Sequence, residues 1–208
     1  MGFQGNTQQN PQIEERKYTI SEYFDFEMTS DRKHEFYDGI IVECSYTSEN
    51  HGEIIHNLDV LLDKCLKGKG CKIYPSDRML YAKSCNRFYY PDVFIVCGER
   101  EYYQHSKNQV ATVNPTVLIE VLSDSTRLVD KDDKLKCYRQ IPSLKQYIIV
   151  EQDFKSIEVY EYDTAKKHWF TKLYEESGDI VRILDCDIPL DDIYFEVNVI
   201  QPNQRSDS

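Results

Sequence analysis

The chain has 208 residues and a formal net charge of −11 at pH 7, a length that suits one domain with a substantial core. This acidity argues against general affinity for polyanions, because phosphate binding depends on clustered lysine and arginine. No apolar run is long enough to span a bilayer, and no charged and then apolar leader opens the chain. We therefore expect a cytoplasmic protein without membrane contact, and any nucleic-acid binding must be local.

The cysteines show no pattern of a disulfide framework or a zinc ribbon, because their number is odd and no C-x-x-C spacing occurs. We expect them to be reduced core residues. They are Cys44, Cys65, Cys71, Cys85, Cys97, Cys137 and Cys186.

The first half of the chain predicts a hairpin and a helix. Residues 1–15 and 199–208 are polar and are expected to be disordered tails around a single domain over residues 16–198. The dipeptide Asp38-Gly39 lies between two strand-like halves and predicts a β-hairpin. The segment that follows has apolar residues at helical spacing, with Asn50 as the expected N-cap and Glu53 completing a capping box.

The second half of the chain alternates strand-like and helical segments. Strands are predicted for "KIYPS", "RMLYA", "RFYYPDVFIVCG" and "TVLIEVLS", and the last two are apolar enough to be buried on both faces. A polar turn then leads into a second helix within "STRLVDKDDKLKCYRQI", before "LKQYIIVEQD" and "SIEVYEYD" return to strand character. This order favours an α/β or α+β fold with one central mixed sheet flanked by helices.

Two carboxylates occur where buried strands are expected. Glu120 interrupts the apolar run "TVLIEVL", and Asp92 stands at the head of "DVFIV". If the strands are neighbours, the two side chains converge, and two like charges in a partly dry site are tolerable mainly with a cation between them or with one carboxyl protonated. Hard carboxylate oxygens without a nearby Cys/His cluster suit Mg²⁺ or Mn²⁺.

A metal-assisted hydrolysis also needs a group that positions water or balances phosphate charge, and lysine is a common choice. Leu122, two positions beyond Glu120, does not supply it. On the second helix Lys131, Lys134 and Tyr138 share one face. Lys134 flanks the apolar stripe and is the best placed to reach back over the sheet.

At these residues the sequence resembles the Uma-two family of restriction-endonuclease-like proteins, within the PD-(D/E)XK nuclease superfamily. The resemblance runs from about Tyr18 to Glu196, and its motifs are specific only in combination. They are Glu35 and Gly39 in the hairpin, Pro91-Asp92, Glu120 to Ser123, Ser125-Thr126, Lys134-Leu135, Tyr138, Pro142-Ser143 and Tyr147.

The resemblance implies a restriction-endonuclease-like core with Asp92 and Glu120 as metal ligands. It also implies that Lys134 on the helix replaces the lysine of the superfamily's E-x-K motif, which reads Glu120-Val121-Leu122 here. The main-chain carbonyl of Val121 and the carboxylate of Glu35 are further candidate ligands. The expected cofactor is Mg²⁺ or Mn²⁺, the expected partner is DNA, and a symmetric homodimer is expected, with residues 101–109 as one candidate contact.

Each of these residues also has a plainer interpretation. Asp92 can be a strand-entry residue after a proline, Glu120 and Lys134 can form a structural salt bridge, and a lysine in a helix dense in Asp and Lys is often part of a solvated charged face. Glu35 can equally be a surface acid at a strand edge. The paired histidines of a zinc helix are absent, since His51 and His56 are five residues apart, and we expect both on a helix surface or an interface.

Two hypotheses of different classes follow. The first is a Mg²⁺-dependent endonuclease with Asp92, Glu120 and Lys134 as catalytic residues. The second is a catalytically silent nuclease-fold module that binds protein or nucleic acid, favoured by the net acidity. If DNA binds, the positive surface is expected at the rim of the carboxylate site, from Lys67, Lys69, Lys72, Arg87, Lys131 and Arg139.

Overall fold

The computed structural model describes residues 16–123, 127 and 129–200. The expected tails at 1–15 and 201–208 lie outside the described residues. The two first residues of the expected C-terminal tail are described, and the N–H of Ile200 donates to the carbonyl oxygen of Asp153 at 2.7 Å.

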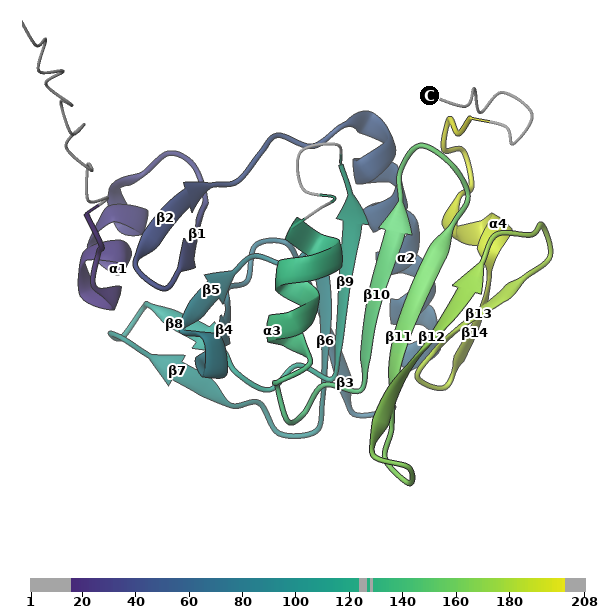
Figure 1. The fold of residues 1–208 in the computed structure, drawn as a ribbon. Coiled ribbons are helices and arrows are strands. Elements are labelled where there is room, and N and C mark those ends of the chain that lie inside the picture. Colours follow the sequence, from purple (N-terminus) through teal and green to yellow (C-terminus); the bar gives the residue numbers. More distant parts are fainter. Residues whose placement is uncertain (1–15, 124–126, 128, 201–208) are drawn as a thin grey trace, which may run out of the picture.

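The larger of two six-stranded sheets forms the centre of the molecule (Figure 1). Its strand order is β12-β11-β10-β9-β6-β3, and all neighbours are antiparallel except β9 and β10. The strands are β3 (Cys71–Pro75), β6 (Val93–Cys97), β9 (Val117–Leu122), β10 (Gln146–Glu151), β11 (Ile157–Asp163) and β12 (His168–Tyr174).

Helices cover both faces of this sheet (Figure 1). On one face, α2 (Glu49–Leu66) packs Ile54, Leu58 and Leu62 against odd positions of β6 and β9 and even positions of β10. The other face is covered by η2 (Val129–Lys134), a π-helical segment, and by α3 (Leu135–Tyr138), which packs against the opposite side chains of the same strands. Since side chains alternate along a strand, each of the central strands is buried on both sides.

The second six-stranded sheet lies beside the first and has the order β2-β1-β5-β4-β8-β7. Its first two strands form the predicted hairpin, whose turn residues Asp38 and Gly39 both have positive φ, 47° and 103°, as a type I′ turn requires. The short α1 (Ile20–Thr29) packs on this sheet through Tyr23 and Phe24. The strands are β1 (His34–Tyr37), β2 (Ile40–Glu43), β4 (Leu80–Ala82), β5 (Arg87–Tyr89), β7 (Tyr102–Gln104) and β8 (Val110–Thr112), with the 3-10 turn η1 (Lys83–Cys85) between β4 and β5.

The mixed α+β fold is confirmed, but the expected single sheet is two sheets with a third, two-stranded sheet beside α2. That third sheet consists of β13 (Ile180–Ile183) and β14 (Cys186–Pro189) and leads into α4 (Leu190–Ile193). Local pattern reports which residues are extended, whereas the division into sheets depends on pairing between distant segments.

The expectation of reduced cysteines is wrong for six of the seven. The structure pairs Cys71 with Cys97, which the register of β3 and β6 places directly opposite each other. Spacing along the chain does not report such proximity. The other disulfides are Cys65–Cys186 and Cys85–Cys137, and Cys44 is free. Because disulfides are rare in a reducing cytosol, the expected cytoplasmic location stays a prediction.

The start of α2 bears on the site. The N-cap of α2 is Ser48, whose hydroxyl accepts from the His51 N–H, so the expectation of Asn50 as N-cap is wrong by two residues; a pattern defines helix ends less well than helix centres.

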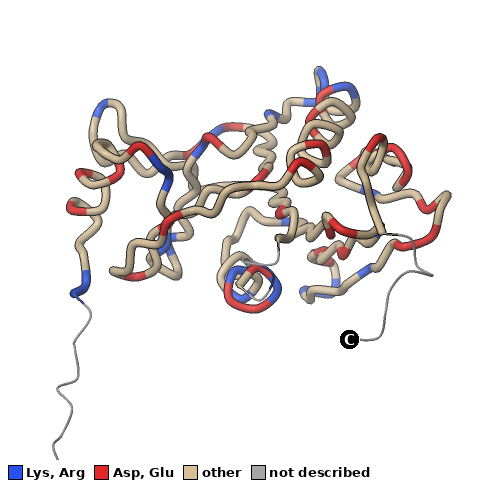
Figure 2. The backbone as a smooth tube through the Cα atoms, turned by 90° about the horizontal axis from the view of Figure 1, so that it is seen from above, with Lys and Arg blue, Asp and Glu red and all other residues tan. Residues whose placement is uncertain are grey.

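Figure 2 shows Asp and Glu spread over most of the described elements with Lys and Arg interspersed. Within the described part of the chain, none of the helices combines the length and hydrophobicity needed to cross a membrane.

Candidate functional site

Neighbouring strands bring the two predicted carboxylates together. Val93 of β6 pairs with Ile119 of β9 in antiparallel register, so Asp92 and Glu120 follow directly opposite each other. Both occupy even positions and belong to the sheet face that η2 and α3 cover. The Asp92 Oδ2 atom accepts from the N–H of Val121 at 2.8 Å, which fixes the carboxylate against the end of β9.

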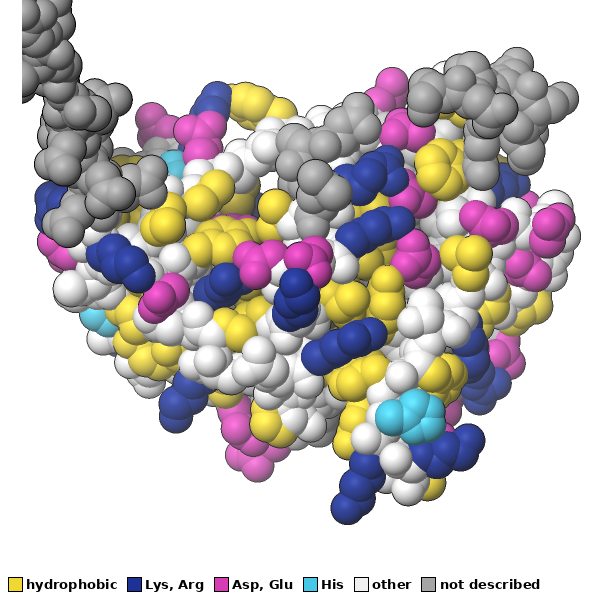
Figure 3. All heavy atoms as spheres, viewed as in Figure 1, with side chains coloured by type: hydrophobic (Ala, Val, Ile, Leu, Met, Phe, Trp, Pro, Cys, Tyr) yellow, Lys and Arg dark blue, Asp and Glu magenta, His cyan; other side chains and the backbone are white. Residues whose placement is uncertain are grey.

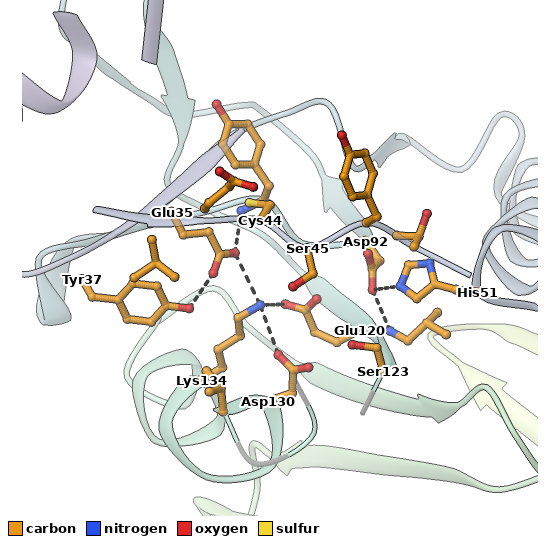
Figure 4. A pocket seen from close by; sticks show the side chains of 17 residues that line it. Glu35, Tyr37, Cys44, Ser45, His51, Asp92, Glu120, Ser123, Asp130 and Lys134 are labelled. Carbon is orange, nitrogen blue, oxygen red and sulfur yellow. Dashed lines mark hydrogen bonds and ion pairs between the residues drawn. The ribbon is translucent and has the colours of Figure 1, made fainter. Parts of the chain in front are cut away.

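Lys134 lies at the centre of a cage of carboxylates (Figure 4). Its Nζ atom is 3.2 Å from Glu120, 3.1 Å from Asp130 and 3.4 Å from Glu35. The Tyr138 hydroxyl also donates to Glu120 Oε1, at 2.9 Å. The predicted helix lysine therefore does reach back over the sheet. The π-helical form of η2, a geometry often found at functional sites, carries both Asp130 and Lys134.

Glu35 enters the cage from the β1–β2 hairpin and is buried, so the interpretation as a surface strand-edge acid is wrong. Its Oε1 atom accepts from the N–H of Tyr90 at 3.1 Å, and its Oε2 atom accepts from the Tyr37 hydroxyl at 2.5 Å. The second sheet thus contributes one carboxylate to a site whose other members stand on the first sheet and on η2.

The electrostatics of the cage are unbalanced. Burial raises the pKa of Glu120 well above its ordinary value; Lys134 opposes this shift, and the charges of Asp130, Asp92 and Glu35 add to it. Burial alone would lower the pKa of Lys134, but Glu120 and Glu35 outweigh it and hold the ammonium protonated. Three carboxylates therefore share one lysine, with Asp92 as a fourth beside Glu120, in a site where Glu120 and Asp130 are only 3% and 2% exposed.

His51 belongs to this site, and the expectation of a helix-surface or interface residue is wrong. It stands in the first turn of α2, is 4% exposed, and its Nε2 atom lies 3.1 Å from Asp92 Oδ2. Among the described residues, its buried Nδ1 atom has no hydrogen-bond partner. Since the ring nitrogen and the Val121 N–H both engage Oδ2, the second oxygen of Asp92 is left for another ligand.

These groups line a cavity of about 190 Å³, which we call the catalytic cavity after the predicted catalytic residues in its walls (Figure 4). The donor set suits a hard divalent cation, because carboxylate oxygens predominate and their negative charge exceeds that of one lysine. Among residues 16–123, 127 and 129–200, no three Asp, Glu, His or Cys side chains already converge at metal-binding geometry; the Lys134 ammonium lies between three of the carboxylates instead. Val121 lines the cavity through β9, and its carbonyl stays a predicted ligand.

The expected basic rim is only partly at this site. His51 in the first turn of α2 lines the cavity, whereas Lys67 caps the other end of the helix, about 24 Å away at 1.5 Å per residue. The prediction that Lys67, Lys69 and Lys72 flank the carboxylates is therefore wrong. Lys131 lies near the site but is paired with Glu158 at 2.7 Å.

Sequence reasoning missed Asp130 and His51. The i, i+4 spacing of Asp130 and Lys134 is a usable signal for an ion pair on a helix, but Asp132 and Asp133 blur it. No local signal links His51 to Asp92, which is 41 residues further along the chain.

The fold is similar to that of a solved structure. A crystal structure described as a putative nuclease belonging to DUF820 from Anabaena variabilis matches with a TM-score of 0.67, over 85% of this chain and 97% of that one. The two sequences are 14% identical, so this likeness concerns the mixed α+β fold.

Sequence comparison defines the family. The family model Uma2, described as "Putative restriction endonuclease", matches residues 20–186, and the chain belongs to this family. It is 32% identical to the uncharacterized protein sll1609 of Synechocystis sp. over 162 residues, which cover 78% of this chain and 90% of the relative. A second uncharacterized protein of that organism, slr1290, is 28% identical over 86% of this chain and 92% of its own length.

Proposed function

We propose that the protein is a metal-dependent endonuclease that hydrolyses DNA phosphodiester bonds. In this proposal Asp92 and Glu120 hold Mg²⁺ or Mn²⁺ and Lys134 assists the chemical step, with the Val121 carbonyl and Glu35 as further ligands. The observation that carries it is the excess of buried carboxylates over cations in the catalytic cavity. Buried like charges of this kind are tolerated when a cation joins them.

Each residue has a defined part in this proposal. Asp92 is oriented by His51 and by the Val121 N–H. Lys134 carries a protonated amine that donates to oxygen atoms, whether of Glu120 or of a phosphate group brought beside it. A bound metal ion supplies a Lewis acid for a phosphate oxygen and a lowered pKa for a coordinated water.

The test compares two buried or half-buried glutamates. Parent protein, Glu120→Gln and Glu158→Gln are incubated with plasmid, linear duplex and single-stranded DNA in Mg²⁺, Mn²⁺ or a chelator. Glu158 pairs with Lys131 outside the cavity, so its variant controls for the loss of one carboxylate near η2. We expect metal-dependent cleavage by the parent and by Glu158→Gln but not by Glu120→Gln. Equal cleavage by Glu120→Gln, or no cleavage by the parent in any metal, would contradict the proposal.

A second candidate function is a catalytically silent nuclease-fold module. The observation in its favour is that the Lys134 ammonium already bridges Glu35, Glu120 and Asp130. Calorimetric titration with Mn²⁺ separates the two functions. A site that disappears in Glu120→Gln supports the nuclease, and the absence of binding at millimolar metal supports the silent module.

A symmetric homodimer is a further part of the proposal. Within the predicted contact segment, β7 is the edge strand of the second sheet, and Tyr102 on it is half exposed. An edge strand can pair with its own copy across a two-fold axis. Sedimentation equilibrium over a range of micromolar concentrations tests this, and a constant monomer mass counts against it.

A further inference from the structure

A second cavity adjoins the catalytic cavity. It has a volume of about 390 Å³ and lies between α1, the loop that follows α1, the turn before β4, and the β7–β8 turn. We call it the cationic cavity, because Arg32, Lys33 and Arg78 stand among its walls, although Glu27, Asp31 and Asp77 also line it. Tyr90 lines both cavities.

Tyr90 forms the partition between the two cavities. Its main-chain N–H donates to Glu35 on the catalytic side, and its hydroxyl donates to Glu27 on the cationic side, at 2.9 Å. The Glu27 carboxylate also accepts from the His34 N–H and lies 3.1 Å from the His34 ring. The Glu27 carboxylate therefore points into the protein, where it accepts hydrogen bonds from Tyr90 and His34.

Arg32 connects the cavities at their rims. It lines the cationic cavity, and its guanidinium forms an ion pair with Glu43 and a 2.6 Å hydrogen bond with the Tyr46 hydroxyl. Glu43 and Tyr46 both line the catalytic cavity. The two cavities therefore share a wall at Tyr90 and meet at their rims through Arg32.

Three cations match the three carboxylates that line the cationic cavity, whereas a single lysine faces the carboxylates of the catalytic cavity. Within residues 16–123, 127 and 129–200, Arg78 has no carboxylate in ion-pair contact, and Lys33 pairs only with the exposed Asp77, at 2.5 Å. Surface pairs of this kind are weak and exchange readily for other anions. Arg32 stacks on Tyr46 and Lys33 lies over Tyr90, 4.5 Å and 5.6 Å from the ring centroids. Cations interleaved with aromatic rings are the pattern of single-strand binding.

We propose that the cationic cavity binds the part of a single-stranded polynucleotide that adjoins the phosphate in the catalytic cavity. Arg32, Lys33 and Arg78 hold a phosphate group, and Tyr46 and Tyr90 offer ring faces to a base. This inference rests on the proposed nuclease function for the identity of the strand. Beyond that function, the inference names the class of substrate of the nuclease, which is a flexible single strand.

Burial of the acidic groups favours a single strand over a duplex. Glu120 and Asp130 lie at the base of a small cavity, and a flexible strand bends to follow two adjoining hollows. The base faces of a duplex are stacked on one another and cannot meet Tyr46, whose side chain is 82% exposed. In a single strand each base has a free face for such a ring.

Binding is tested without cleavage, in chelator, by fluorescence anisotropy of a labelled oligothymidylate of about 12 nucleotides. The variants are Arg32→Ala/Arg78→Ala, Tyr46→Ala and, as a control, Lys67→Ala at the far end of α2. We expect the double variant to bind at least about tenfold more weakly than the parent. The slope of log affinity against log salt concentration should become shallower by about 0.7 for each phosphate contact that is lost. Tyr46→Ala should weaken binding with the slope unchanged, and Lys67→Ala should match the parent.

Two comparisons complete the test. A duplex of the same length should bind more weakly than the oligothymidylate, and an oligouridylate of that length distinguishes RNA from DNA as the source of the strand. Equal affinity for the duplex, or equal binding by the double variant and Lys67→Ala, overturns the inference. Melting temperatures confirm that the exposed Arg32 and Arg78 can be replaced without unfolding.

Cleavage in Mg²⁺ or Mn²⁺ is measured separately on the same oligonucleotides. Arginine-dependent binding without any cleavage by the parent overturns the proposed nuclease function and supports the strand-binding cavity. Glu120-dependent cleavage of DNA with unchanged affinity in the double variant supports the nuclease function and overturns the strand-binding cavity.

Discussion

Two lysines three residues apart on η2 have very different surroundings. Lys134 is 7% exposed in its side chain and faces Glu35, Glu120 and Asp130, whereas Lys131 is 34% exposed and pairs with Glu151 and Glu158. Figure 3 shows Lys and Arg interspersed with Asp and Glu on the face that α3 covers.

The charge balance of the two clusters separates a candidate site from a surface network. Around Lys131 a second cation, Arg127, pairs with Glu151, so that cations and nearby carboxylates are nearly matched. In the catalytic cavity Asp92 and Glu43 add two carboxylates to the three around Lys134, and no second Lys or Arg is among the described residues that line the walls. Buried, unmatched charge is costly, and it is found most often at binding and catalytic sites. On this ground we propose a functional part for Lys134 and a structural part for Lys131, and each variant below tests that division.

The largest effect is expected for Asp92→Ala. This change removes a carboxylate that has one oxygen held by His51 and Val121 and the other left for a ligand. We expect loss of detectable Mn²⁺ binding by calorimetry and a fall in single-turnover cleavage of several orders of magnitude. Asp153→Ala, beside Arg127 in the surface network, is the control and should retain both. Undiminished metal binding by Asp92→Ala would remove the metal site from this cavity.

The next effect is expected for Lys134→Ala. Removing the one lysine from the cage leaves buried carboxylates without their cation, which costs about 3–5 kcal/mol of unfolding free energy. Removing a catalytic donor also slows the chemical step by about 10²–10⁴-fold. Melting temperature and single-turnover cleavage measure the two losses independently. Glu120→Gln in the same background should restore part of the stability but none of the rate. A destabilised Lys134→Ala that cleaves at the parent rate would reduce Lys134 to a structural partner.

How far the sequence predicts these clusters depends on whether the signal is local. Glu120 was found because a charge within an apolar strand is conspicuous, and the Asp38-Gly39 turn because its chemistry is specific. Asp130 was missed because Asp132 and Asp133 look the same in sequence, and only the packing of η2 on the sheet buries one of them.

The same distinction holds for the fold. The apolar spacing of α2 predicted its helix, because a helix buries one continuous face. The strand β12 was not predicted, since its residues are only half buried along the sheet edge. The partner of His51 and the division into two sheets depend on pairings between distant segments, which a local pattern does not contain.

A smaller effect concerns pH and the stability of the metal-free protein. Burial raises the pKa of Glu120, so the folded state favours the protonated carboxyl. This contribution to stability is complete below the unfolded-state pKa near 4.5, and it is lost as pH rises through the pKa of the folded state. Lys134, whose pKa is also raised, keeps its charge through this range. We therefore expect Glu120→Gln to gain stability relative to the parent as pH rises from acid to neutral, measured by urea unfolding in chelator.

Added Mn²⁺ should reverse that order at neutral pH, because a metal ion binds the ionised carboxylate of the parent and stabilises the folded state. The control is Glu158→Gln, because Glu158 lies outside the cavity and its pKa is lowered. Burial raises the pKa of Glu158, but the hydrogen bonds from Lys131 and Tyr160 and the charge of Lys131 outweigh burial. A parent protein that gains stability relative to Glu120→Gln as pH rises in chelator would contradict the raised pKa.

The smallest effect is expected for Lys131→Ala. The ammonium of Lys131 is 3.2 Å from Glu151 and 2.7 Å from Glu158, but its side chain is one third exposed, so water replaces much of what the ion pairs contribute. We expect a loss of unfolding free energy of about 1 kcal/mol or less, with Mn²⁺ affinity and the single-turnover rate unchanged. Arg127 remains to balance Glu151, which is why no carboxylate is stranded. A Lys131→Ala variant that folds normally yet loses cleavage as Lys134→Ala does would place both lysines in one site and end the distinction drawn between them.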